Sequence, residues 1–186
     1  MTSPRTVGGR DRLRLFCGLQ LPDETLDRLV SWQHAELAGP DVRVVAREHL
    51  HVTLAFLGSR PAGDVPTVVE ALRGAATDAE PPLLQAVRYR ETRSVGMVVL
   101  ADTNDRAARL ADDLQRRLEE LGVYEREARP WLPHVTVARF RSRPRLQPAP
   151  PDLGAVSPSD AALYNSVLRS TGAQYVILES VALGGT

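Results

Sequence analysis

The chain contains the tetrapeptide His51-Val52-Thr53-Leu54 and, in its second half, the closely similar His134-Val135-Thr136-Val137. Both alternate polar and apolar residues, which predicts half-buried strands in which side chains two residues apart share a face. His51 and Thr53 are therefore expected on one face, over Val52 and Leu54 in the core, and the second copy repeats this arrangement. If a pseudo-twofold axis relates the two halves of the chain, the two His-Thr pairs converge on one cleft.

Two imidazoles and two hydroxyls in one cleft suit chemistry at phosphorus. Because the ordinary pKa of histidine is near 6.5, one ring can act as a base and the other as an acid near neutral pH. The hydroxyls of Thr53 and Thr136 can bond the oxygens of a phosphate held between the rings. In-line attack on phosphorus needs neither a metal nor a covalent intermediate with this inventory, so we expect no cofactor.

Two other interpretations compete with this hypothesis. A single His-x-Thr in a strand is usually structural, because threonine favours strands, and only the repetition gives the pattern weight. Alternatively, His49, His51 and His134 could bind zinc. The zinc interpretation leaves the repeated threonines unexplained, and the sequence places no carboxylate where it would obviously orient the ligands.

Composition excludes several classes of protein. The chain has 186 residues, with 23 basic and 23 acidic side chains, and this balance argues against a broad basic surface that holds long nucleic acid. All the basic residues are arginine, which excludes Schiff-base enzymes, phosphate-loop nucleotidases and ligases with a lysyl-nucleotide intermediate. Cys17 is the single cysteine, so an intrachain disulfide is excluded. The sequence shows neither a signal peptide nor a membrane span, and we expect a cytoplasmic protein.

Strand patterns alternate with helix patterns, and hairpins recur between them. Residues 1–11 are expected to form a flexible tail, and 12–186 a single domain. Strands are expected over 13–21, 42–46, 49–57, 83–91, 96–101, 134–141, 161–169 and 175–183. Helices are expected over 22–38, 64–78 and from a cap at Thr103 or Asn104 to 121. The proline-rich stretch 144–158 cannot be a central strand. This order favours an α+β fold with mainly antiparallel sheets.

The segments around the repeat resemble a known family. His49 to Gly58 (HLHVTLAFLG) and Pro133 to Arg139 (PHVTVAR) are similar to the two signature motifs of the two-histidine (2H) phosphoesterase superfamily. Arg14 to Pro22 and the segment Leu163 to Leu168 resemble the opening strand and the closing hairpin of its RNA 2′,3′-cyclic phosphodiesterase branch, also called 2′-5′ RNA ligase-like. The resemblance implies a bilobal pseudo-twofold unit with two mainly antiparallel sheets lining a central cleft and helices outside.

The resemblance also implies roles for individual residues. It makes His51 the proton donor and His134 the acceptor, and it places Thr53 and Thr136 on the phosphate. Arg139 matches an arginine that follows the second motif of the family, and a guanidinium suits phosphate. Strict alternation puts Arg139 on the face opposite His134, so either the strand bulges there or the side chain reaches round its edge.

The implied activity is hydrolysis of 2′,3′-cyclic phosphates, on RNA 3′ ends or on nucleosides, to 2′-phosphates without a metal. Weak reverse joining of 2′-phosphate and 5′-hydroxyl ends is a side expectation. The alternatives are another 2H activity, on 2′-5′ oligonucleotides or small cyclic nucleotides, and a module that binds RNA ends without turnover. We expect a monomer with no protein partner and no membrane association.

Other side chains have two interpretations each. Phe16 and Tyr164 could stack a nucleobase or pack between sheet and helix. Arg129, just before the second motif, could contact phosphate. Three further arginines could either form a solvated edge or guide an RNA end: Arg141, Arg143 and Arg145.

Overall fold

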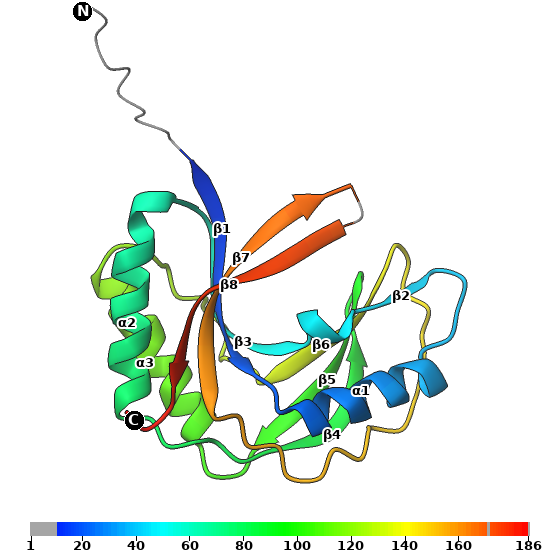
Figure 1. Ribbon diagram of the computed structural model, residues 1–186. Coiled ribbons are helices and arrows are strands. Elements are labelled where there is room, and N and C mark those ends of the chain that lie inside the picture. Colours follow the sequence, from blue (N-terminus) through cyan, green and yellow to red (C-terminus); the bar gives the residue numbers. More distant parts are fainter. Residues whose placement is uncertain (1–10, 171, 186) are drawn as a thin grey trace, which may run out of the picture.

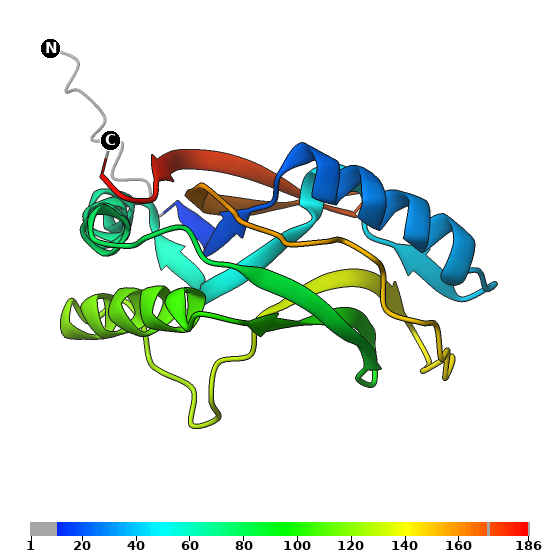
Figure 2. The same ribbon diagram turned by 90° about the horizontal axis from the view of Figure 1, so that it is seen from below.

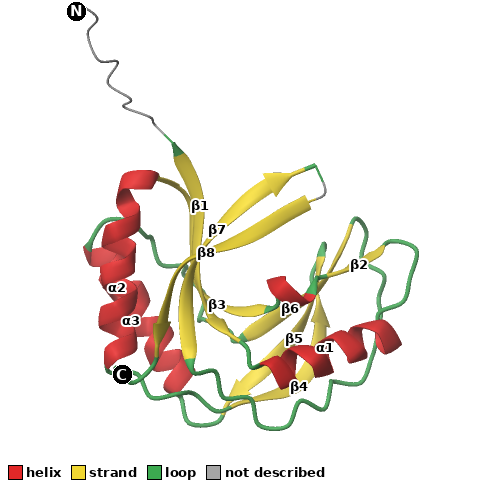
Figure 3. Cartoon of the chain, in the orientation of Figure 1, coloured by secondary structure: helices red, strands yellow, loops and turns green. Residues whose placement is uncertain are grey.

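The alternating segments form strands and the periodic segments form helices in the computed structural model, which describes residues 11–170 and 172–185. The strands are β1 (Arg12–Gln20), β2 (Val42–Val44), β3 (His51–Pro61), β4 (Leu84–Glu91), β5 (Val95–Asp102), β6 (His134–Phe140), β7 (Asp160–Arg169) and β8 (Gly172–Ala182). The helices are α1 (Asp23–Glu36), α2 (Val65–Thr77) and α3 (Arg106–Glu120), with 3-10 turns η1 (Arg47–His49) and η2 (Ala62–Asp64). The expected α+β class is confirmed (Figure 3). Residues 1–10 of the expected tail lie outside the described residues.

The strands pair antiparallel in the order β4-β5-β6-β3-β1-β7-β8, and β2 pairs with β6. The two motif strands, β3 and β6, lie at the centre and pair at one position, Val52 with Val135. The expectation of two sheets is corrected in this respect, because this pair joins the sheets of the two lobes into one curled sheet (Figure 1).

The register of the sheet supports the expected pseudo-twofold relation. β1 pairs Leu19 with Val52, and β5 pairs Val98 with Val135, so each motif valine is flanked in the same way. In chain order, β1, α1 and β3 form one half, and β5, α3 and β6 form the other. The local axis therefore passes through the Val52–Val135 pair, between the two His-Thr repeats.

β3 begins later and runs further than the expected strand over 49–57. η1 occupies 47–49, so β3 starts at the motif histidine itself. Gly58 takes a φ of 69°, where β3 bulges opposite β1, and the strand bends there and continues to Pro61. Gly58, the first residue after the predicted strand, therefore does not end it and provides the left-handed conformation that the bulge needs.

The helices pack at opposite ends of the molecule. α2 and α3 lie side by side at one end, and α1 lies at the other (Figures 1 and 2). α3 begins later than expected, since Asn104 accepts from the N–H of Arg106 at 3.3 Å and Asp102 accepts from the N–H of Ala108 at 2.8 Å. Within the described ranges, none of the helices is long and apolar enough to cross a membrane.

The proline-rich stretch crosses the molecule as an irregular strap. The carboxylate of Glu91, at the end of β4, is buried and accepts hydrogen bonds from the backbone N–H groups of Arg145 and Leu146 and from Arg143. At the other side, Trp32 of α1 donates through Nε1 to the carbonyl of Ala149 at 2.9 Å. The strap therefore links β4 to α1. It joins the sheet at one position, where Val156 bridges Leu84 of β4, and it forms no central strand.

Candidate active site

The two motif histidines are held in the same way. His51 Nδ1 lies 2.7 Å from the carbonyl oxygen of His49, and His134 Nδ1 lies 2.8 Å from that of Leu132. A carbonyl only accepts, so each Nδ1 carries a proton and donates it. Each Nε2 is therefore left to exchange a proton with a substrate.

The antiparallel pair Val52–Val135 sets the four polar side chains of the repeat against one another. By this register His51 lies across from Thr136, and His134 lies across from Thr53. Thr53 Oγ1 is 3.0 Å from His51 Nε2, so in the ligand-free protein the hydroxyl can donate to this nitrogen. All four side chains are partly exposed, whereas the valines between them are buried.

Two adjoining cavities open over this face of the sheet. The first, which we call the motif cleft, has a volume of about 580 Å³ and includes His51, Thr53, Thr136 and Arg139 in its lining. The second, the Trp131 cavity, has a volume of about 470 Å³ and includes Trp131 and His134. Thr53 and Phe56 line both cavities. The structure thus brings four of the five predicted site residues to one cleft and His134 to its neighbour.

Aromatic rings enclose His51. Phe16 stacks on the imidazole with centroids 4.8 Å apart, and Tyr175 meets it edge-on at 5.5 Å. Tyr164 stacks on Phe16 at 4.7 Å and lies 5.7 Å from the imidazole. Phe16 and Tyr164 are both buried, and with Tyr175 they form an aromatic wall beside His51. Phe16 also lines the motif cleft.

Burial in this aromatic wall lowers the pKa of His51 to about 4, mainly because the charged imidazolium is poorly solvated there. The hydrogen bond to the carbonyl of His49 opposes this shift, and the nearby charges of His134, His49 and Arg139 add to it. His51 is therefore neutral at pH 7 in the ligand-free protein, which suits its acceptance of the Thr53 hydroxyl.

Arg139 lines the motif cleft because β6 bulges. Opposite β5, Gly96 pairs with Ala138 and Met97 with Thr136, so the strand carries one extra residue between them. The bulge shifts the alternation of side chains and turns Arg139 to the face of His134. Of the two possibilities that the sequence left open, the bulge is correct.

The motif cleft is rich in cations. Arg14 and Arg43 line it together with Arg139, and none of the three forms an ion pair with a carboxylate among the described residues. In contrast, Arg129 pairs with Glu127 at 2.7 Å in the Trp131 cavity. Arg143 is bound to the strap anchor Glu91, at 3.1 Å, and not to the cleft. Uncompensated guanidinium groups beside two imidazoles favour an anion.

His49 packs against the closing hairpin. Its ring centroid is 4.5 Å from that of Tyr175, and its Nε2 accepts from the N–H of Tyr175 at 3.4 Å. Across residues 11–170 and 172–185, no three His, Cys, Asp or Glu side chains are grouped to hold a metal ion. His49, His51 and His134, the residues of the zinc interpretation, do not form such a group.

Sequence reasoning missed Gly18, which faces the motif histidine from β1. A Cβ at this position would lie 3.0 Å from the carbonyl oxygen of Val52 and 3.1 Å from His51 Cδ2. Only glycine lets β1 approach the ring so closely. The signal in the sequence is a lone glycine inside an apolar strand pattern.

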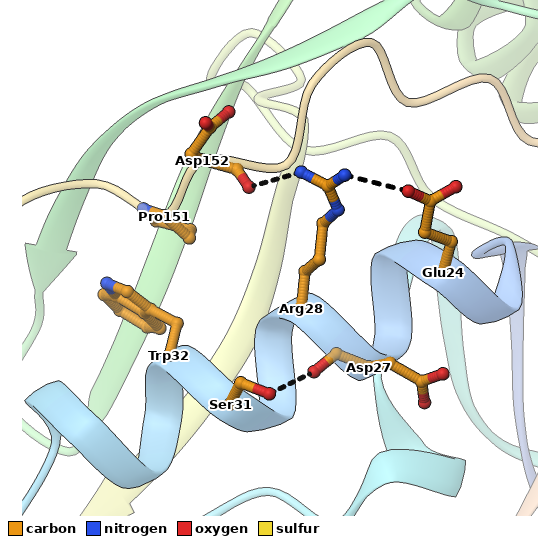
Figure 4. A pocket seen from close by; sticks show the side chains of 7 residues that line it. All are labelled: Glu24, Asp27, Arg28, Ser31, Trp32, Pro151 and Asp152. Carbon is orange, nitrogen blue, oxygen red and sulfur yellow. Dashed lines mark hydrogen bonds and ion pairs between the residues drawn. The ribbon is translucent and has the colours of Figure 1, made fainter.

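A third hollow, of about 530 Å³, lies between α1 and the strap (Figure 4). Its polar groups bond to one another, since Arg28 contacts Glu24 and the carbonyl of Asp152, and Ser31 donates to the carbonyl of Asp27. It shares no lining residue with the motif cleft or the Trp131 cavity.

Comparison with known proteins agrees with the geometry of this site. The family described as the 2′-5′ RNA ligase superfamily matches residues 21–168. An RNA 2′,3′-cyclic phosphodiesterase of Thermus thermophilus is 32% identical over 184 residues, covering 93% of this chain and 91% of the relative. One of Escherichia coli is 26% identical over 172 residues, covering 91% and 96%. The crystal structure of the Thermus thermophilus protein TT0787 superposes with a TM-score of 0.81 at 28% identity, covering 93% of this chain and 99% of that protein.

The fold and the paired His-Thr strands thus define a two-histidine phosphoesterase. The chain belongs to the 2′-5′ RNA ligase superfamily.

Proposed function

We propose that this protein is an RNA 2′,3′-cyclic phosphodiesterase, which hydrolyses terminal 2′,3′-cyclic phosphates to 2′-phosphates. The observation that carries the proposal is the pair of His-Thr repeats about the Val52–Val135 pair. Each histidine is held through Nδ1, and the motif cleft beside them contains arginines without ion pairs among the described residues. Relatives that match nearly the whole chain carry this name, which supports the proposal.

In the proposed mechanism the phosphate lies over Thr53 and Thr136, with Arg139 on its oxygens. His134 Nε2 takes a proton from the attacking water, and phosphorus passes through an in-line transition state. The P–O3′ bond breaks, and His51 Nε2 gives its proton to the departing 3′-oxygen. The 2′-phosphate remains. After one turnover His134 is protonated and His51 is neutral, and proton exchange with water restores the starting states of both rings.

The proton on His51 arrives with the substrate. In the ligand-free protein burial keeps the pKa of this ring near 4, so it is neutral. An anionic phosphodiester beside the ring stabilises the imidazolium and raises the pKa, because an opposite charge favours the charged form. Binding of the substrate therefore favours protonation of His51, which then serves as the acid in the reaction.

The test of the proposal is turnover of the 2′,3′-cyclic phosphates of all four nucleosides, with the product identified by phosphorus NMR. His51→Ala and His134→Ala are expected to fold and to lose about 10²–10⁴-fold in kcat, the usual contribution of a general acid or base. His34→Ala is the matched control, since His34 is exposed on α1. Near wild-type rates in either motif variant, or a 3′-phosphate product, would contradict the mechanism.

The Trp131 cavity favours a second activity at the same site. A cyclic nucleotide needs one cavity for its nucleoside, but a 2′-5′ linkage has a nucleoside on each side of phosphorus. The cavity beside His134 offers the second place, so we propose weak joining of 2′-phosphate and 5′-hydroxyl ends.

A protein that binds nucleotides without any turnover would instead be a binding module. A monomer that acts on RNA ends in the cytoplasm stays a prediction, which light scattering and cell fractionation would check.

A further inference from the structure

Both motif strands bulge at the same place. Opposite β1, β3 carries the extra residue Leu54, ahead of its other bulge near Gly58, and opposite β5, β6 carries the extra residue Val137. Each is the third residue after its motif histidine. Beyond the bulge the side chains change faces, so Phe56 and Arg139, at equivalent positions, are exposed in the motif cleft instead of buried.

A buried glutamine from the opposite half meets each bulge. Gln33 of α1 donates through Nε2 to the carbonyl of Val137 at 2.7 Å and to that of Val45 at 3.0 Å. Gln115 of α3 donates through Nε2 to the carbonyl of Leu54 at 2.8 Å. Each helix precedes the motif strand of its own half in the chain, yet its glutamine reaches the motif strand of the other half.

Core packing alone does not account for these residues. Gln33 is 2% exposed and Gln115 is 7% exposed, and a buried amide costs free energy unless it is hydrogen-bonded. Methionine would fill a similar volume without that cost. What the glutamines add is a donor for the carbonyl of the extra residue in each bulge, at two positions that the pseudo-twofold axis relates.

We propose that Gln33 and Gln115 are positioning residues of the active site, and that they act by holding the bulges. Gln33 fixes Arg139 toward the phosphate, and Gln115 fixes Phe56 at the junction of the two cavities. The proposal rests on the proposed function, because the phosphate defines what Arg139 is positioned for.

The physical argument is clearest at Gln33. The carbonyl of Val137 accepts from the N–H of Val45 at 2.9 Å and from Gln33, so both of its lone pairs are used. Without Gln33 the carbonyl of Val45 loses the amide donor, and the carbonyl of Val137 keeps only the N–H of Val45. A β6 that returned to regular pairing would follow strict alternation and turn Arg139 away from the cleft.

A double-mutant cycle on phosphate affinity tests this inference. Arg139→Ala is expected to weaken binding of inorganic phosphate about tenfold or more, and Gln33→Met about threefold to tenfold, the size of one lost neutral hydrogen bond. In the Arg139→Ala background Gln33→Met is expected to add nothing, because the group that it positions is absent. Leu72→Ala, in the core of α2, lowers stability without touching either bulge and should keep the wild-type affinity.

The symmetry-related variant gives a second readout. Gln115→Met is expected to leave the affinity for inorganic phosphate near the wild-type value and to weaken binding of a nucleoside 2′-monophosphate, since Phe56 lines both cavities at their junction. Gln33→Met should weaken both ligands by the same factor. If the two glutamines only stabilised the fold, Gln33→Met and Gln115→Met would change the affinities for phosphate and for the nucleoside 2′-monophosphate in the same way.

Full additivity of Gln33→Met and Arg139→Ala, or wild-type phosphate affinity in Gln33→Met, would overturn the inference. If Gln33→Met does not fold, Gln33→Asn, which is one methylene shorter, replaces it with the same expectation. Phosphate binding needs no turnover. A wild-type protein that binds phosphate without hydrolysing cyclic nucleotides would therefore contradict the proposed function, while the cycle would still decide the role of Gln33.

Discussion

In the proposed mechanism His51 carries a proton, yet its surroundings disfavour the charged ring. The aromatic wall of Phe16 and Tyr175 provides the burial that lowers the pKa of His51 to about 4. The stacked face of Phe16 can stabilise the imidazolium once an anion balances it, because aromatic faces attract cations. The residue is thus neutral when the cleft is empty and can become charged when phosphate is bound.

This predicts a titration that responds to ligand. In the free protein, NMR of the His51 ring should show a midpoint near pH 4, below the ordinary value of 6.5. Saturation with inorganic phosphate should move the midpoint upward, because the anion stabilises the protonated ring. Phosphate binding should accordingly take up a proton between these two midpoints. A midpoint that is unchanged by phosphate would contradict the loading of His51 by substrate.

The same shift predicts how stability depends on pH. Between about pH 6.5 and 4 the unfolded chain binds a proton at residue 51 and the folded chain does not. The contribution of His51 is therefore fully present above 6.5 and is lost, by up to about 1.4 kcal/mol per pH unit, as the pH falls toward 4. Urea unfolding of wild type and His51→Gln at pH 7 and pH 5 checks this. The variant should lose less stability on acidification.

At the scale of elements, β1 and β3 approach each other more closely at the active site than side chains normally allow. Gly18→Ala would bring its Cβ within 3.1 Å of His51 Cδ2 and 3.0 Å of the Val52 carbonyl. We expect kcat to fall about tenfold to hundredfold, because a displacement of the ring by a fraction of an ångström misaligns the acid, and stability to fall by about 1–3 kcal/mol. Gly63→Ala is the matched control, with no atom within 4 Å of its added Cβ. Equal kinetics in the two variants would show that the ring is not held there.

Much of the element order could be predicted from the sequence, because the strands alternate and the helices keep an apolar stripe. The bulges could not, although Leu54-Ala55 and Val137-Ala138 each break the alternation with two consecutive apolar residues. Such a pair is common in strands and says nothing about the donor that holds it. Gln33 and Gln115 are far from the motifs in sequence, and only the fold brings them there. The joining of the two lobes into a single sheet likewise depends on the Val52–Val135 pair, and no local sequence pattern predicts that pairing.

The strap between β4 and α1 predicts a further stability effect. Glu91 is the only acceptor among the described residues for the N–H groups of Arg145 and Leu146. Glu91→Ala should lower the free energy of unfolding by about 2–4 kcal/mol, since two backbone donors and Arg143 lose a buried carboxylate. Asp152→Ala, at the far end of the strap, should cost less than 1 kcal/mol, roughly the effect of a surface change. Denaturant unfolding measures both values, and similar losses would show that Glu91 does not anchor the strap.

At the scale of the whole molecule, two cavities meet at the proposed phosphate site, and each contains one of the two motif histidines. Thr53 and Phe56 form the boundary between the cavities. The pseudo-twofold relation explains this arrangement, because each half contributes one His-Thr strand and its own side of the opening. Hydrolysis of a cyclic mononucleotide uses one nucleoside place, whereas joining two RNA ends uses both.

This difference predicts that the Trp131 cavity controls joining more than hydrolysis. Tyr124 lines that cavity, and burial raises the pKa of its hydroxyl, so the ring is a neutral surface on which a base can stack. Tyr124→Ala should lower the rate of joining a 2′-phosphate end to a 5′-hydroxyl end about fivefold to a hundredfold, the range for one lost base–aromatic stack. Hydrolysis of a nucleoside 2′,3′-cyclic phosphate should fall by a much smaller factor. Leu168→Ala, which alters only the motif cleft, is the matched variant and should not change the ratio in that direction. Equal losses in both reactions for Tyr124→Ala would mean that the second nucleoside does not enter the Trp131 cavity.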